Sequence, residues 1–492
     1  MLPLPDWVNR ETDLRILKVG LVILTSIVPF VAMVSLFVMT GYVFSVLPPY
    51  RTVVAQVIAK KSFNSELEGL RGLLAFSVVI HHSVVWYLCI FYGSADINGP
   101  NANLYGQLGV GAVTMFFFIT GFLFWSKLIV KPRPIFKSFL VSRLRRLGPA
   151  YLGALVFLVV LVAALTHFQL RTSPVTLVRD LVRILCAETP LLNGLSITPW
   201  LWGVTWTLRF ECLFYLIIPF VGWFAGTLRK SLLFVGVCGL LCVLNRAVRA
   251  VHLIPPGFDL YEGFVRYLFS TFSVGIMCAQ LVRVPRLKAF GRSSWAALIA
   301  VAVLAVSMYF VPAKYGYLES LSLAFPFFVV ACGCSFWGVL RSRAVLFLGQ
   351  ISYSVYLIHP LIFGAVLIPL YRMRGSAMQT PRAWWTVLFL MAPAIVGVAT
   401  LWHRMFELPF LMKSAKITGP PDTGRRTSPL RPAYVAAGGA PVLQRQMRTF
   451  AFGVGANHAA AGAVSEAGRP GLFRLAGFVP RRLRRTHSIH QG

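Results

Sequence analysis

Residues 68–88 of the chain, EGLRGLLAFSVVIHHSVVWYL, decide its class of fold. After Arg71 the stretch is apolar over nearly the length of roughly 20 residues that a helix needs to cross the hydrocarbon of a bilayer. Only serines and histidines interrupt it. An ionisable side chain at the centre of a membrane span costs at least about 2.5 kcal/mol. The stretch therefore predicts a membrane-spanning helix whose histidines need an explanation.

The sequence as a whole has the composition of an integral membrane protein. Of its 492 residues, 57% are hydrophobic and only 13% are charged, whereas about 25% of an ordinary soluble domain is charged. Apolar runs of spanning length occur near residues 19–47, 69–92, 107–126, 149–168, 203–225, 231–250, 263–282, 294–312, 320–340, 345–370 and 384–410. The sequence thus predicts an all-α, polytopic membrane helical bundle of about eleven transmembrane helices.

The basic residues predict how this bundle is oriented. There are 47 Lys and Arg against 15 Asp and Glu, a net charge of +32, and positive charge in short loops marks the cytoplasmic side. The loop after the third span has seven cations and no carboxylate; these cations are Lys127, Lys131, Arg133, Lys137, Arg143, Arg145 and Arg146. Alternation of the loops then predicts an extracytoplasmic amino terminus and a cytoplasmic carboxyl-terminal tail.

The tail and the cysteines add little chemistry. Residues 413–492 are rich in Gly, Ala, Pro and Arg without sustained apolar periodicity, which is typical of a disordered basic segment. The eight cysteines lie mostly in apolar runs and have no paired spacing. We therefore expect no metal site and no disulfide framework.

Few ionisable side chains fall inside the predicted spans. Glu211 is the one carboxylate with apolar sequence well extended on both sides, and His359 interrupts another apolar run. His82 follows Arg71 by eleven residues, close to three helical turns and about 16 Å of rise, so the two share one face, whereas His81 points about 100° away. The spacing favours His82 as a titratable base; the alternative is a buried histidine that only hydrogen-bonds to a carbonyl.

Cations also open the fourth span. Arg143 and Arg146 are three residues apart and lie on one helical face at the inner surface, and guanidinium groups bind phosphate through bidentate hydrogen bonds. The pair suits a phosphorylated ligand that enters from the cytosol. The alternative is that these cations serve membrane topology alone, with Arg71 reaching out to lipid phosphates.

Five segments occur in the order known from one family of membrane enzymes. They are Glu68-Gly-Leu-Arg71-Gly-Leu-Leu-Ala75 with His82, Phe116-Phe-Phe-Ile-Thr-Gly-Phe122, Arg143-x-x-Arg146-Leu-Gly-Pro149, Trp206-Thr-Leu-Arg-Phe-Glu211-Cys-Leu-Phe214-Tyr215 and Ser352-Tyr353-Ser-Val-Tyr356-Leu-Ile-His359. Over about residues 66–410 the chain resembles the acyltransferase 3 family. It departs from that family at Thr120 and Thr207, where Ser is commoner, and at Cys212, where a second carboxylate is common.

The resemblance implies a division of the chain into three parts. Residues 66–412 would form a ten-helix acyltransferase membrane domain, and residues 1–65 an extra N-terminal transmembrane helix with a cytoplasmic connector. Residues 413–492 would be the basic tail. Many members carry a fused esterase-like domain, which is not expected here because the tail has no Gly-Asp-Ser motif.

The resemblance also implies a function. Members move acyl groups, commonly acetyl, from cytosolic acyl-coenzyme A to hydroxyls of sugars in surface polysaccharides, lipopolysaccharide or related glycans. The expected partners are therefore the lipid bilayer, acyl-CoA as donor and a glycan acceptor, without nucleic acid. The expected location is the bacterial inner membrane.

The candidate residues take roles in such a reaction. His82 would be the base and Glu211 would support it; Arg71, Arg143 and Arg146 would hold the donor phosphates. Trp206, Tyr215 and His359 would contact the acceptor. The competing prediction is a proton-coupled transporter or flippase, which would also need intramembrane His and Glu. Turnover of acyl-CoA distinguishes the two.

Overall fold

The computed structural model describes residues 24–48, 50–59, 65–93, 97, 101–132, 136–188, 191–250 and 259–410. All of them belong to one compact unit, residues 1–415. The predicted disordered tail, residues 413–492, lies outside the described residues, so that prediction stays untested.

The described chain is almost entirely helical. Its longer helices are α2 (Ile27–Val46), α4 (Ser65–Tyr92), α5 (Ala102–Val130), α6 (Phe136–Leu165), α8 (Thr198–Ile217), α9 (Leu228–Ala250), α13 (Ser294–Phe310), α16 (Ser352–Arg374) and α17 (Pro381–Trp402). The shorter ones are α3 (Tyr50–Ala59), α7 (Pro174–Leu185), α10 (Asp259–Tyr267), α11 (Ser273–Leu281), α12 (Pro285–Gly291), α14 (Tyr317–Ala331) and α15 (Arg343–Gln350). A two-residue antiparallel hairpin, β1 (Leu191–Leu192) and β2 (Leu195–Ser196), precedes α8.

The apolar helices confirm a polytopic all-α membrane protein. Among the described residues, eight helical segments are long and apolar enough to cross a bilayer, or nine if the pair α12 and α13, bent by 66°, counts as one span. Helices α8 and α14 do not meet this test, and the predicted span at 345–370 is two helices, α15 and α16, that break at Ile351. The count of eleven is therefore not confirmed.

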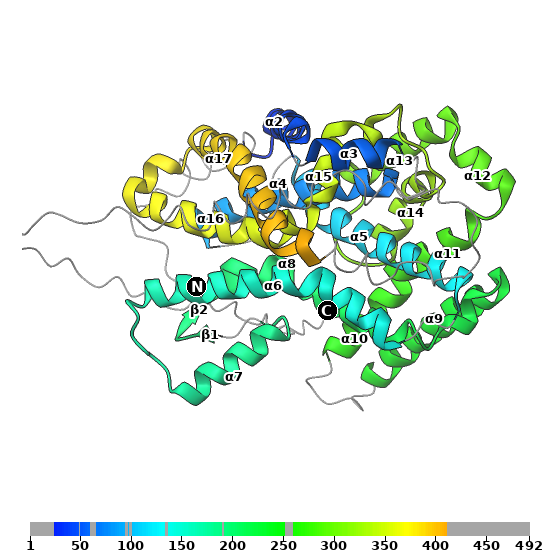
Figure 1. The fold of residues 1–492 in the computed structure, drawn as a ribbon, viewed down its shortest axis with the longest axis horizontal. Helices are drawn as coiled ribbons and strands as arrows, with labels where there is room; N and C mark the ends of the chain where they lie inside the picture. The colour runs from blue at the N-terminus through cyan, green and yellow to red at the C-terminus, as the bar shows by residue number, and fades with distance from the viewer. Residues whose placement is uncertain are drawn as a thin grey trace, which may run out of the picture. The chain divides into compact units, whose positions relative to one another are not determined.

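Small residues let the central helices pack closely. A methyl group at Gly275 of α11 would lie 2.1 Å from the Phe118 carbonyl oxygen of α5, and one at Gly121 would lie 2.4 Å from the Phe272 carbonyl oxygen. Only glycine fits such a contact, which is the usual way in which membrane helices approach one another. This contact holds α11 against α5 (Figure 1), which also packs on α4, α13 and α14.

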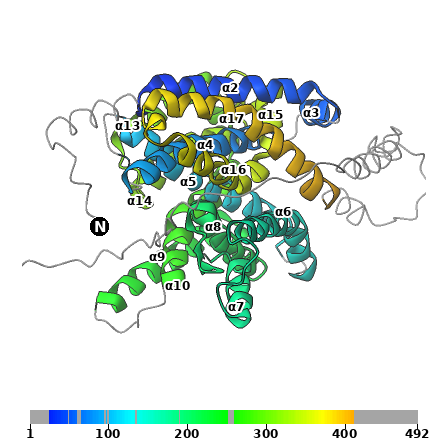
Figure 2. The same ribbon diagram turned by 90° about the vertical axis from the view of Figure 1, so that its left-hand side faces the viewer.

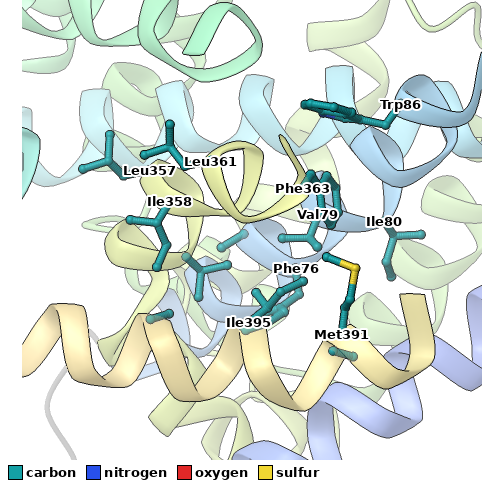
Figure 3. Close-up of a cluster of buried hydrophobic side chains, with 14 of the residues drawn as sticks. Phe76, Val79, Ile80, Trp86, Leu357, Ile358, Leu361, Phe363, Met391 and Ile395 are labelled. Carbon is teal, nitrogen blue, oxygen red and sulfur yellow. The ribbon is translucent and has the colours of Figure 1, made fainter. Parts of the chain in front are cut away.

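A buried apolar cluster fixes α4 against α16 and α17. Phe76 and Val79 of α4 lie with Ile358 of α16 and with Met391 and Ile395 of α17 (Figure 3). On the outer side of α17, α2 runs along it (Figure 2). Because α4 carries His82 and α16 carries His359, this cluster sets the distance between the two histidines.

The segment between α6 and α8 folds back along the bundle. The Tyr151 hydroxyl, at the middle of α6, donates a hydrogen bond to the Ile184 carbonyl at the end of α7 (2.6 Å), and Arg209 Nε of α8 donates to the Ala187 carbonyl (2.8 Å). Helix α7 therefore lies beside α6 (Figure 1) rather than in a loop beyond its end. Its buried Asp180 pairs with Arg179 and Arg183.

Candidate active site

Four cationic side chains line one cavity between α4, α5, α6, α8 and α16. They are Arg71, Lys127, Arg143 and Arg146. The other walls of the cavity are largely aromatic and aliphatic. The three arginines that the sequence nominated as a phosphate-binding set thus meet in one place, and Lys127, which had been counted only as a loop cation, joins them.

Two of these cations lie near the same aromatic ring. The Arg143 guanidinium carbon lies 5.2 Å from the centre of the Phe124 ring, and Lys127 Nζ lies 5.4 Å from the same centre. Cation–π attraction of about 0.5–2 kcal/mol offsets part of the repulsion between the two charges. Arg143 Nε is buried without a hydrogen-bond partner, so this guanidinium has a donor free for a ligand.

Glu211 faces the same cavity. Its Oε2 accepts a hydrogen bond from the Tyr215 hydroxyl one turn further along α8 (2.7 Å), and its Oε1 accepts one from Thr120 Oγ1 of α5 (3.3 Å). Thr120, which stands where the family more often has Ser, keeps the hydroxyl that this bond needs. The carboxylate is thus held on the cation-lined wall. The Tyr215 hydroxyl, which the sequence assigned to the acceptor, is already used in the hydrogen bond to Glu211.

His82 pairs with His359 and not with Glu211. His82 Nδ1 and His359 Nε2 are 2.7 Å apart, and the two rings are nearly parallel, with centroids 5.0 Å apart and an interplanar angle of 19°. We expected Glu211 to contact His82, but in the structure His359 is the hydrogen-bond partner of His82 Nδ1, because α4 packs on α16. His359 is fully buried, so its expected contact with an acceptor would be indirect.

The hydrogen bonds of this pair fix its tautomers. His359 Nδ1 lies 2.9 Å from the Val355 carbonyl oxygen, which can only accept, so Nδ1 carries the hydrogen. In neutral His359 the Nε2 atom must then accept, and His82 Nδ1–H must donate to it. This arrangement leaves the lone pair of His82 on Nε2, where a general base needs it.

Two other candidates lie outside the cavity wall. His81 Nδ1 donates to the Tyr105 carbonyl (2.8 Å), and its ring covers Gly109, where a methyl group would lie 2.5 Å from it. His81 thus makes the hydrogen bond to a carbonyl that the sequence offered as the alternative role for a buried histidine. Trp206 packs in an aromatic cluster with its ring centroid 5.1 Å from that of Tyr315 and 5.8 Å from that of Phe210.

Tyr356 stands between the cavity and the histidine pair. It lines the cavity, whereas its ring centroid is 6.4 Å from that of His359. Its hydroxyl lies 2.9 Å from Thr207 Oγ1 and donates to the Val204 carbonyl (3.1 Å), both on α8. The sequence placed Tyr356 in a motif but gave it no role.

A second buried carboxylate lies behind the cavity wall. Glu407 accepts a hydrogen bond from Ser354, which follows the lining residues Ser352 and Tyr353. It lies in a π-helical turn, residues 403–407, after α17, a distortion that often occurs at functional sites. In the sequence Glu407 lies near the end of the predicted span 384–410, so it was not recognised as a buried carboxylate. Within the described residues, no group of three or more His, Cys, Asp or Glu is placed to hold a metal ion.

Comparison with known proteins gives one match. The model of a family described as an acyltransferase domain matches residues 64–403, which is well over half of the chain. No curated protein and no solved structure matches the chain.

Proposed function

The chain belongs to the acyltransferase 3 family of membrane acyltransferases, and from this premise we propose that it is an O-acyltransferase. It takes an acyl group, acetyl in the simplest case, from acyl-CoA at the cytoplasmic face of the bacterial inner membrane. It transfers this group to a sugar hydroxyl of a cell-surface polysaccharide, lipopolysaccharide or related glycan. The observation that carries the proposal is the cavity in which four cations meet beside apolar walls.

This cavity suits the donor. Coenzyme A carries several phosphates on one half and an uncharged thioester arm on the other, so it needs cations at one end of its site and uncharged walls at the other. Arg71, Arg143 and Arg146 offer guanidinium forks for phosphate, and Lys127 adds a fourth charge. The predicted topology places these residues toward the cytosol, where the donor is made.

His82 takes the proton from the acceptor. The acceptor oxygen attacks the thioester carbonyl carbon as its proton moves to His82 Nε2, and the new C–O bond forms as the C–S bond breaks. The leaving thiolate takes the proton back from the imidazolium. His359 accepts the hydrogen bond of His82 Nδ1–H throughout, so it orients His82 and stabilises the charge that His82 gains.

The acyl group must pass Tyr356 to reach this base, because Tyr356 lines the cavity and neither histidine does. The reacting atoms have to come within about 3–3.5 Å of one another. Thr207 and the Val204 carbonyl hold the Tyr356 hydroxyl on α8. We therefore assign the thioester end of the donor to the space beside Tyr356.

Transfer of radiolabelled acetyl from acetyl-CoA into envelope glycans tests the proposal in inverted membrane vesicles. The native protein should label glycan, and His82→Asn should not, although the Asn amide can still donate to His359. His167→Asn, at an exposed histidine, is the matched control and should label as the native protein does. Full labelling by His82→Asn would exclude His82 as the base. Glycan movement without release of thiol would assign the chain to transport instead.

A further inference from the structure

A buried acid and a buried amide meet away from the active-site cavity. Glu319 of α14 and Gln107 of α5 are each 1% exposed. Gln107 Nε2 donates to Glu319 Oε2 (2.6 Å) and to the Val311 carbonyl (2.9 Å). Neither residue lines the cavity, and the proposed reaction uses neither.

Each residue has one oxygen without a partner. Glu319 Oε1 and Gln107 Oε1 are both buried and unbonded. A methyl group on Gly111 would lie 2.8 Å from Gln107 Oε1 and 3.2 Å from Glu319 Oε1, so the two oxygens border the same small space. Turning the amide over does not help, because its nitrogen already faces two acceptors, Glu319 Oε2 and the Val311 carbonyl.

The pair lacks one hydrogen. Two oxygens that only accept repel each other, and burial of a carboxylate charge without a cation is strongly unfavourable. A hydrogen on Glu319 Oε1 would donate to Gln107 Oε1 and satisfy both atoms at once. With the existing bond from Gln107 Nε2, this closes the two-bond ring in which a carboxylic acid pairs with a carboxamide.

We propose that Glu319 and Gln107 form a proton-binding site, in which neutral Glu319 donates to Gln107 and locks α5 to α14. Among the described residues no Lys or Arg forms an ion pair with Glu319, and Tyr315 is the titratable group that interacts with it electrostatically. The ligand that completes the site is a single proton.

Hydrogen bonds next to this pair join α5 to the turn between α13 and α14. Asn103 Nδ2 donates to the carbonyls of Val311 (2.6 Å) and Met308 (3.1 Å), and its Oδ1 accepts from the Ala313 amide (3.0 Å). The first turns of α5 are thus tied to the turn between α13 and α14. Lys127 lies 20 residues further along α5, about 30 Å away, so the proton site lies at the end of α5 opposite the cations.

Infrared spectroscopy of the purified protein tests the proposal directly. The native protein should show the carbonyl stretching band of a protonated carboxylic acid, and Glu319→Gln should lack it. Glu188→Gln, at a carboxylate that pairs with Arg183 near the surface, should keep the band. Gln107→Leu should shift the band toward that of a free acid. A spectrum unchanged by Glu319→Gln and by Gln107→Leu would overturn the assignment.

Thermal stability provides the second readout. A Gln side chain at position 319 can form the same ring without a titrating group. The native protein, whose Glu319 is protonated when folded and ionised when unfolded, should lose Tm relative to Glu319→Gln as pH rises. Parallel pH profiles would contradict the proposal. So would stabilisation of the native protein, but not of Glu319→Gln, by sodium over choline chloride, because a metal ion would then fill the space.

Discussion

The tautomer of His82 is set by its hydrogen bond to His359, which lies 277 residues further along the chain. The Val355 carbonyl orients His359, His359 orients His82, and only the last ring has a free nitrogen. In a hydrolase triad a carboxylate orients the catalytic imidazole. Here a second imidazole would orient it, without placing a negative charge beside it within the membrane.

Replacement of His359 should separate orientation from binding. His359→Leu removes the acceptor for His82 Nδ1–H, so kcat should fall roughly 100-fold, within the range of general-base contributions, while the KM for the donor stays constant. His359→Gln keeps an acceptor oxygen and should restore much of the rate. Steady-state kinetics in detergent or nanodiscs measures both. Equal rates for His359→Leu and the native protein would exclude the relay.

The guanidinium groups of Arg143 and Arg146 should bind the donor phosphates through their planar shape as well as their charge. In a double variant, Arg143→Lys with Arg146→Lys, charge and topology remain but the bidentate contacts are lost. The KM for the donor should rise about tenfold, equivalent to about 1.4 kcal/mol. Arg145→Lys, on the same helix but outside the cavity wall, is the control. An unchanged KM in the double variant would show that these cations serve topology alone.

The sequence predicted the candidate site in part. Helical spacing placed Arg143 beside Arg146, and both line the cavity with Arg71 and Glu211. Periodicity along one helix cannot report which helices pack together, so the partner of His82 could not be read from it. Glu211 was expected to support His82 only because it is the one carboxylate deep in an apolar run, and not because its helix was known to pack beside His82.

At the scale of elements, close backbone contacts set the position of α5. Hydropathy recognised most helices, but it also joined α15 and α16 into one span. Gly349 lies two residues before the break at Ile351, and it packs so closely on α4 that a methyl group there would lie 2.2 Å from the Glu68 carbonyl oxygen. Helix α14 is shorter than its predicted span because the chain turns at Gly333, where φ is +94°.

A methyl group should disturb the contact between α5 and α11. In Gly275→Ala the new carbon would overlap the Phe118 carbonyl oxygen, and overpacking typically costs about 1–3 kcal/mol. Gly236→Ala, where nothing lies within 4 Å, should not destabilise α9 and serves as the control. Thermal unfolding in detergent should show a lower Tm for Gly275→Ala only. Equal Tm values would mean that the helices separate at little cost.

At the scale of the whole molecule, the described bundle has chemically different ends. The cavity with its four cations lies toward the Lys127 end of α5, and the acid–amide pair lies toward the other end. The proposed acyl-CoA donor carries several charges and cannot cross the bilayer, so the proposal requires it to enter from the side on which the cations lie.

Sidedness of the reaction should follow from this. Acetyl-CoA added to sealed inverted vesicles should label glycan, whereas the same addition to sealed right-side-out vesicles should not, because the cations face the interior there. Permeabilisation should restore labelling in the second case. Labelling of sealed right-side-out vesicles would reverse the predicted topology of α4 and α6.

Helix α7, folded back between α6 and α8, constrains how the protein is made. During synthesis Tyr151 emerges before α7, but Arg209, which holds the Ala187 carbonyl, emerges 22 residues after it. Both contacts lie at the carboxyl-terminal end of α7. The bond from Tyr151 to Ile184 can therefore form as soon as both residues have left the ribosome, whereas the bond from Arg209 to Ala187 must wait for α8. The contacts that fix this end of α7 are therefore completed in two steps, the second only after α8 has been made.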